Sequence, residues 1–154
     1  MYNIILSLHS FLRWVILLLL VINLIRHFTA LKKPFGSADK KLGLWLMIFT
    51  HITFLLGIYQ WFAGAYGYHN ISDIGMSAVM QNHAYRFFAI EHTVGMIVAI
   101  ILITIARGVF RKNVTDTKKH KRCIILYLFA LIIIIASIPW PGMQEIGRPL
   151  LRGF

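Results

Sequence analysis

The segment IILSLHSFLRWVILLLLVINLI, residues 4–25, contains almost only apolar side chains. A helix that crosses a bilayer needs about 20 such residues in succession. No Lys or Arg precedes the segment, its apolar run is too long for a secretory signal peptide, and no small-residue cleavage site follows it. The segment therefore predicts a permanent membrane-spanning helix.

Three further apolar runs, residues 42–62, 87–106 and 123–138, have the same character. The chain of 154 residues is 58% hydrophobic and 14% charged, whereas soluble domains are about half apolar and a quarter charged. Helices joined by short loops pack as antiparallel neighbours. We expect an all-α membrane protein in which residues 1–154 form a single domain, a four-transmembrane-helix bundle with up-down-up-down topology.

The sixteen Lys and Arg residues outnumber the five Asp and Glu, and twelve of them fall in the loops 26–41 and 107–122. The positive-inside rule places these loops in the cytoplasm, with both termini and the loop 63–85 outside. His27 and His120 lie among these basic residues and are expected to be solvated there. No nucleic-acid-binding motif accompanies the basic clusters, so the expected partner is the lipid bilayer and not a nucleic acid.

Ionisable side chains inside a span cost about 2.5–3.5 kcal/mol each and normally mark function. The single cysteine leaves histidine as the candidate ligand for any metal. Counted at 1.5 Å per residue from the basic end of each helix, His9 lies about 26 Å, His92 about 22 Å and His51 about 15 Å from the inner surface. Since the first and third spans are diagonal in such a bundle, His9 and His92 should face each other. They are the predicted axial ligands of one haem b.

Two arginines are candidates for the propionate groups of such a haem. Arg13 lies one turn from His9 on the same helix face, and it is expected to pair either with a propionate or with Glu91 on the facing helix. Arg86 lies just outside the third span and is expected to serve the outer propionate.

Several short patterns resemble those of small four-span bacterial membrane proteins described as cytochrome B-like. This resemblance covers essentially the whole chain and implies haem b, electron transfer and a multi-pass protein of the bacterial inner membrane. It also implies that His51 is a third candidate ligand. The patterns that carry it are Leu8-His9-Ser10 with Arg13-Trp14, His51 with Leu56-Gly57, Arg86-Phe87 with Glu91-His92, and Ile138-Pro139-Trp140-Pro141 with Arg148-Pro149.

Three functions remain open from the sequence. The leading hypothesis is an electron carrier with one bis-histidine haem that exchanges electrons with a quinone or with a larger membrane redox complex, because six-coordinate iron leaves no site open for a substrate. The second is a non-haem copper or zinc site formed by His9, His51, His92 and Glu91. The third is a cofactor-free accessory subunit of a larger membrane complex. No catalytic residue is assigned under any of the three.

Overall fold

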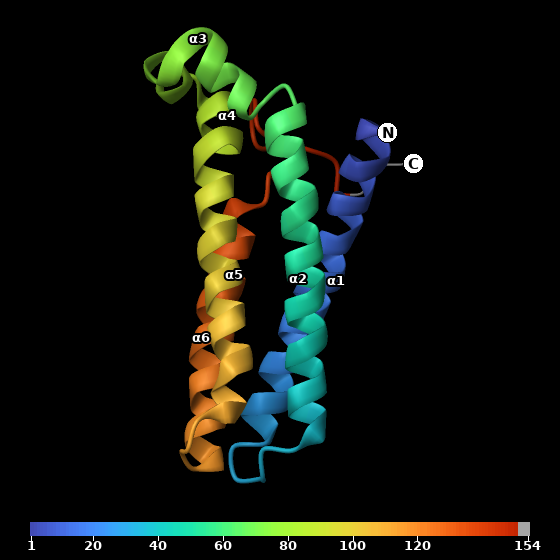
Figure 1. Ribbon diagram of the computed structural model, residues 1–154, viewed down its shortest axis with the longest axis vertical. Coiled ribbons are helices and arrows are strands. Elements are labelled where there is room, and N and C mark those ends of the chain that lie inside the picture. Colours follow the sequence, from blue (N-terminus) through green and yellow to red (C-terminus); the bar gives the residue numbers. More distant parts are fainter. Residues whose placement is uncertain (151–154) are drawn as a thin grey trace.

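The computed structural model describes residues 1–150, and these residues form helices and connecting turns without any strand. Four long helices make up the body of the protein (Figure 1). Their bounds are Tyr2–Thr29 (α1), Ser37–Ala63 (α2), His92–Gly108 (α5) and Asp116–Ser137 (α6). Helix α5 is continued on both sides by short helical segments, so that residues His83–Arg111 form one span. All four spans are long and apolar enough to cross a membrane, as the sequence predicted.

The four long helices form a bundle in which α1 packs against α2 and α6, and α5 packs against the same two helices. Consecutive long helices run in opposite directions (Figure 1). Helices α1 and α5 therefore occupy diagonal positions, which confirms the arrangement expected of the first and third spans. The diagonal places inward-facing side chains of α1 and α5 opposite each other along the bundle axis.

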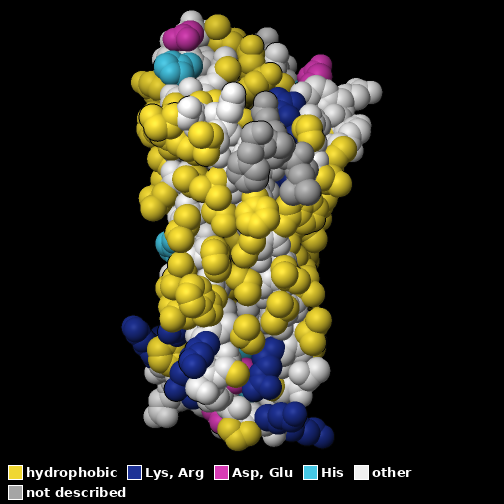
Figure 2. All heavy atoms as spheres, turned by 90° about the vertical axis from the view of Figure 1, so that its right-hand side faces the viewer, with side chains coloured by type: hydrophobic (Ala, Val, Ile, Leu, Met, Phe, Trp, Pro, Cys, Tyr) yellow, Lys and Arg dark blue, Asp and Glu magenta, His cyan; other side chains and the backbone are white. Residues whose placement is uncertain are grey.

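The outer surface of the bundle is apolar over most of its length. Figure 2 shows hydrophobic side chains around the middle, with Lys and Arg gathered at one end. Burying apolar surface is worth about 25 cal/mol per Å² in water, so this surface would be unfavourable there and is suited to lipid. Large exposed apolar residues on the long helices include Leu18, Ile25, Ile52, Leu55, Ile101, Ile105, Phe129 and Ile132.

The turn between α1 and α2 is fixed by Asp39. Pro34 cannot donate a backbone hydrogen bond and marks the break between the two helices. The Gly36 N–H donates to the Asp39 carboxylate at 2.8 Å and caps the start of α2. Arg26, near the end of α1, also donates to Asp39 at 2.8 Å. This carboxylate therefore joins the two helices at the basic end of the bundle.

The connection between α2 and the next span, which was expected to be the loop 63–85, is largely helical. It contains helix α3, Tyr68–Gln81, which lies across the end of the bundle (Figure 1). Gly75 interrupts α3 with φ of 82°, a conformation that side-chain-bearing residues rarely adopt. Val79, a residue of α3 itself, is fully buried. The bend at Gly75 and the burial of Val79 thus allow α3 to cover the end of the bundle. The amino-acid composition of the segment did not predict this helix.

Candidate functional site

His9 on α1 and His92 at the start of α5 face each other between the diagonal helices. Their ring centroids are 6.4 Å apart and the ring planes are inclined by 60°. The predicted proximity of these two imidazoles is confirmed. Both side chains are half-buried between the helices, which shields them in part from the lipid that would otherwise penalise a polar side chain.

Each imidazole is oriented by a backbone carbonyl of a neighbouring helix. The Nδ1–H of His9 donates to the Thr53 carbonyl of α2 at 3.1 Å, and the Nδ1–H of His92 donates to the Ser137 carbonyl of α6 at 2.7 Å. A carbonyl can only accept, so both bonds place the hydrogen on Nδ1 and leave the lone pair on Nε2. Histidines that bind metals are commonly held in this way, with the second nitrogen bonded to an acceptor that fixes the tautomer.

The spacing of the two rings matches that of two ligands of one ion. Imidazoles bound on opposite sides of a metal, with bonds of about 2.0–2.1 Å, have ring centres roughly 6.4 Å apart. The hydrogen bond of each ring to a backbone carbonyl is made through Nδ1 and not through Nε2. The pair therefore offers two imidazole rings whose centres are separated as in a bis-imidazole centre.

The acceptor for His92 follows from the way α6 ends. The last carbonyl groups of a helix have no partner within the helix. Ser137 is the last residue of α6, and Pro139 stops the chain from continuing as a helix. The free Ser137 carbonyl is then available to His92 on the adjacent helix.

The acceptor for His9 lies on a stretch of α2 that comes close to α1. A Cβ atom added at Gly57 would lie 3.3 Å from Cε1 of His9. Gly57 is one turn from Thr53, so both residues are on the same face of α2. The missing side chain at Gly57 leaves room for the imidazole beside the Thr53 carbonyl.

A π-helical turn, Phe87–Glu91 (η1), immediately precedes His92 and was not predicted from the sequence. The Trp61 indole N–H of α2 donates to the Ala89 carbonyl within this turn at 3.0 Å. A π-turn changes the rotation of the residues that follow it, and such turns occur frequently at functional sites. The apolar sequence FFAIE gives no local signal for this turn, although it contributes to the direction in which His92 points.

Arg13 and Glu91 do not form the ion pair that was one of the two expectations for Arg13. Glu91 accepts from Arg86 at 2.7 Å, and this pair is largely exposed. Arg13 donates instead to the Ser10 hydroxyl at 3.4 Å and to the Leu150 carbonyl at 2.6 Å. Within residues 1–150, the buried Nε of Arg13 has no hydrogen-bond partner and its guanidinium has no carboxylate partner. Arg13 lies one helical turn from His9 on the same face of α1.

His51 is not brought to the His9–His92 pair. It lies exposed on α2, and its Nδ1–H donates to the Met47 carbonyl of its own helix at 2.8 Å. Glu91 is held by Arg86 at the surface. The four-residue metal cluster considered from the sequence is therefore not assembled in the described part of the chain.

A second histidine pair, His27 and His120, lies at the basic end of the bundle, and its expected solvation was wrong. The two side chains are 1% and 0% exposed. His27 is stacked between the rings of Phe35 and Tyr127, at centroid distances of 5.6 and 5.8 Å. The adjacent Lys and Arg suggested a solvated environment, but neighbouring residues on a helix point about 100° apart. Burial of the two histidines therefore depends on the helix face on which each one lies and not on the charge of its neighbours in the sequence.

Comparison with models of protein families, with curated proteins and with solved structures finds no match for this chain. The resemblance to cytochrome B-like proteins thus remains a prediction. The residues at the outer pair nevertheless fit a haem in their chemistry, since two neutral imidazoles lie opposite each other and a cationic guanidinium with an unpartnered buried nitrogen lies nearby.

Proposed function

We propose that this protein is a b-type haem cytochrome of the membrane that transfers electrons between a quinone pool or redox partner and another carrier. His9 and His92 are the proposed axial ligands, through Nε2. The observation that carries the proposal is that both imidazoles are fixed by Nδ1 bonds to carbonyls while their centres stand 6.4 Å apart.

The charge of the site favours haem over a bare metal ion. The two imidazoles are neutral, and no carboxylate is hydrogen-bonded to either of them in residues 1–150. An uncompensated divalent ion would be costly in the interior of a bundle within lipid. This ligand set suits an iron whose charge a macrocycle already offsets.

The residues around the pair have distinct tasks in this proposal. The Thr53 and Ser137 carbonyls hold the two rings in place and increase the basicity of Nε2. Arg13 offers the guanidinium that would bind a propionate. The bound haem supplies one-electron chemistry between ferrous and ferric iron. Two histidine ligands would leave no coordination position on that haem for oxygen or another substrate.

The proposal places the protein in the bacterial inner membrane with its basic end in the cytoplasm and both termini outside. It is supported by the gathering of Lys and Arg at one end of an apolar surface (Figure 2) and by the resemblance stated above. His9 and His92 then lie toward the outer half of the bilayer, nearer to partners on that side.

Absorption spectra of the purified full-length protein, expressed with ample haem and recorded before and after dithionite reduction, test the proposal. We expect a low-spin six-coordinate spectrum. His9→Ala and His92→Ala should each lose the haem or become high-spin, because one axial bond is removed. His51→Ala, at an exposed histidine of α2, is the matched control and should keep the wild-type spectrum.

A colourless wild-type preparation would overturn the proposal and favour the cofactor-free accessory subunit. Loss of haem in His51→Ala with retention in His9→Ala would also overturn it, because the ligands would then come from a different pair of helices.

A further inference from the structure

Three metal-ligating side chains from three helices meet near the basic end of the bundle. They are His27 of α1, Asp39 of α2 and His120 of α6, and they are 1%, 2% and 0% exposed. One ligand atom from each lies within 4.8 Å of the other two. The Nδ1 atoms of the two histidines are 2.9 Å apart. In a tetrahedral site with bonds of about 2.1 Å, neighbouring ligand atoms lie about 3.4 Å apart.

The hydrogen bonds in the structure do not satisfy this cluster fully. Two neutral imidazoles that face each other through Nδ1 share a single hydrogen. The Nε2 atom of His120 is buried and has no partner among residues 1–150. Leaving such a group unpaired costs about 1–3 kcal/mol. A shared cation would use the lone pairs of both Nδ1 atoms beside the buried carboxylate, whereas the hydrogen bond uses only one of them; the Nε2 of His120 would keep its present surroundings.

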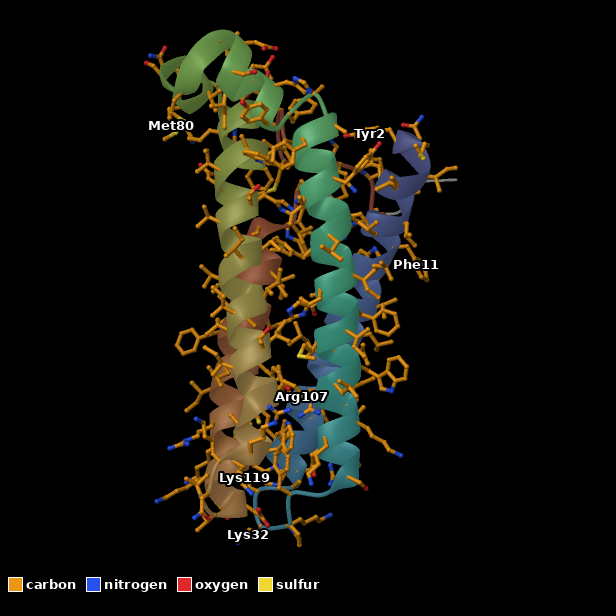
Figure 3. The ribbon with its side chains drawn as sticks, in the orientation of Figure 1. Tyr2, Phe11, Lys32, Met80, Arg107 and Lys119 are labelled. Carbon is orange, nitrogen blue, oxygen red and sulfur yellow. The ribbon has the colours of Figure 1, made fainter. Side chains whose placement is uncertain are left out.

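A small cavity adjoins the cluster and is lined by His27, Asp39 and Tyr127, among other residues. Its volume of about 10 Å³ corresponds to the space for one water-sized particle. Arg107 of α5, which also lines the cavity, extends into the interior of the bundle close to α2 (Figure 3). The cavity thus provides room for one further small ligand beside His27 and Asp39.

We propose that His27, Asp39 and His120 bind one divalent transition-metal ion, with a water molecule in the adjoining cavity as the fourth ligand. Imidazole nitrogen and carboxylate oxygen in this number are typical ligands of Zn²⁺, and three protein ligands with one water form a tetrahedral set. The ion would lie between the two Nδ1 atoms, which would have to move apart from 2.9 Å to the roughly 3.4 Å of neighbouring tetrahedral ligands. It links α1, α2 and α6 where the bundle meets the cytoplasmic surface.

Asp39 is already held in the way expected of a metal-ligating carboxylate. Arg26 Nε donates to its Oδ1 at 2.8 Å, and the Gly36 N–H donates to its Oδ2 at 2.8 Å. Oδ1 keeps a second lone pair for an ion, and hydrogen-bonded carboxylates are common among metal ligands. Arg26, Lys40 and Arg107 also place positive charge around the site, so we expect an affinity low enough for a chelator to remove the ion.

The site is separate from the outer histidine pair. His9 and His27 are eighteen residues apart on α1, which is about 27 Å along a helix. The carboxylate distinguishes the two sites chemically, since it offsets part of the charge of a bare ion. The inner site therefore requires no macrocycle, and its occupation is independent of haem.

Metal titration of the full-length, detergent-purified protein after chelator treatment tests this proposal. Zn²⁺ binding is measured by calorimetry and by elemental analysis after dialysis, and Co²⁺ serves as a spectroscopic probe of tetrahedral ligation. We expect one ion per chain in the wild type. His120→Ala and His27→Ala should weaken binding at least about a hundredfold, because loss of a partner outside the ligand set already costs 10–100-fold.

Three further variants keep the test decisive. His120→Gln preserves side-chain size and polarity if His120→Ala does not fold, and it should lose the ion equally. His51→Ala and the double variant His9→Ala/His92→Ala remove histidines outside the cluster and should still bind one ion. Absence of a stoichiometric ion from the wild type, or equal binding by His120→Gln and the wild type, would show that the cluster is a hydrogen-bonded network only. Unchanged haem content in His120→Gln separates this result from the proposed function.

Discussion

The two histidine pairs of this bundle use the same side chain in different ways. At the outer pair, His9 and His92 bond to backbone carbonyls, and their ring centres are 6.4 Å apart. At the inner pair, His27 and His120 bond to each other, and their ring centres are 5.1 Å apart. The first separation fits ligands on opposite sides of one ion, as proposed for the haem, whereas the second fits neighbouring ligands in the compact cluster proposed for the inner metal ion.

The difference also lies in the charge that each pair has beside it. Asp39 belongs to the inner cluster, while no carboxylate is bonded to the outer imidazoles within residues 1–150. In a medium of low dielectric constant, a bare ion needs an anionic ligand, and a metal within a macrocycle does not. Ring spacing and carboxylate position together predict which kind of metal centre each pair would hold.

The largest effect on stability is expected from Asp39→Ala, which removes the feature that distinguishes the inner pair. The Asp39 side chain is fully buried, and its loss leaves the Gly36 N–H and Arg26 without their acceptor. We expect the folded state to lose about 2–4 kcal/mol, because both donors lose charge-assisted hydrogen bonds. Unfolding of the purified protein in detergent, followed by circular dichroism, measures this loss.

Asp73→Ala on the exposed part of α3 is the matched control and should change stability by less than about 0.5 kcal/mol. Equal stability of the two variants would show that Asp39 neither joins α1 to α2 nor prepares the inner site.

The sequence predicted the outer pair because the helix rise is constant. Counting residues from the basic ends was enough to place His9 and His92 at one depth, and up-down connectivity made their helices diagonal. Burial of His27 and His120 depends on rotation about each helix axis and on Phe35, which reaches over them from the turn. Helix rotation and the position of Phe35 are set by packing. The charge of neighbouring residues therefore gave the wrong prediction that His27 and His120 are solvated.

Helix α3 and the π-turn before His92 could not be predicted from the sequence, because they too depend on packing. Gly75 and its neighbours have the composition of a loop, and only the bend at Gly75 together with buried Val79 makes the segment a cap. The exclusion of His51 from the site likewise follows from its position on the exposed side of α2. Depth alone does not determine which way a side chain points.

Gly57→Val is expected to damage the outer pair while leaving the inner pair intact. A Cβ at this position already meets His9 at 3.3 Å, and the two methyl groups of valine would displace the imidazole from the Thr53 carbonyl. Overpacking of this kind costs about 1–3 kcal/mol. We expect haem content to fall several-fold, measured by pyridine haemochrome, with Zn²⁺ stoichiometry unchanged.

Gly108→Val tests whether replacing any helical glycine by valine would reduce the haem content. Nothing lies within 4 Å of a Cβ built at Gly108, so this variant should retain its haem. Equal haem loss in both variants would attribute the effect to helix propensity instead of the close approach at His9.

The smallest effect is expected from Arg13→Leu, which changes the charge near the outer pair but none of its ligands. The positive guanidinium favours the reduced iron, which carries one positive charge fewer, so its removal should lower the reduction potential. An interaction of about 1–2 kcal/mol across roughly 10 Å corresponds to a fall of roughly 40–80 mV, measurable by redox titration of the haem absorbance. Arg111→Leu, exposed at the opposite end, should leave the potential nearly unchanged because solvent and salt screen its charge. If Arg13→Leu also leaves the potential unchanged, Arg13 serves to anchor the Leu150 carbonyl against α1, and the charge that tunes the outer pair lies elsewhere.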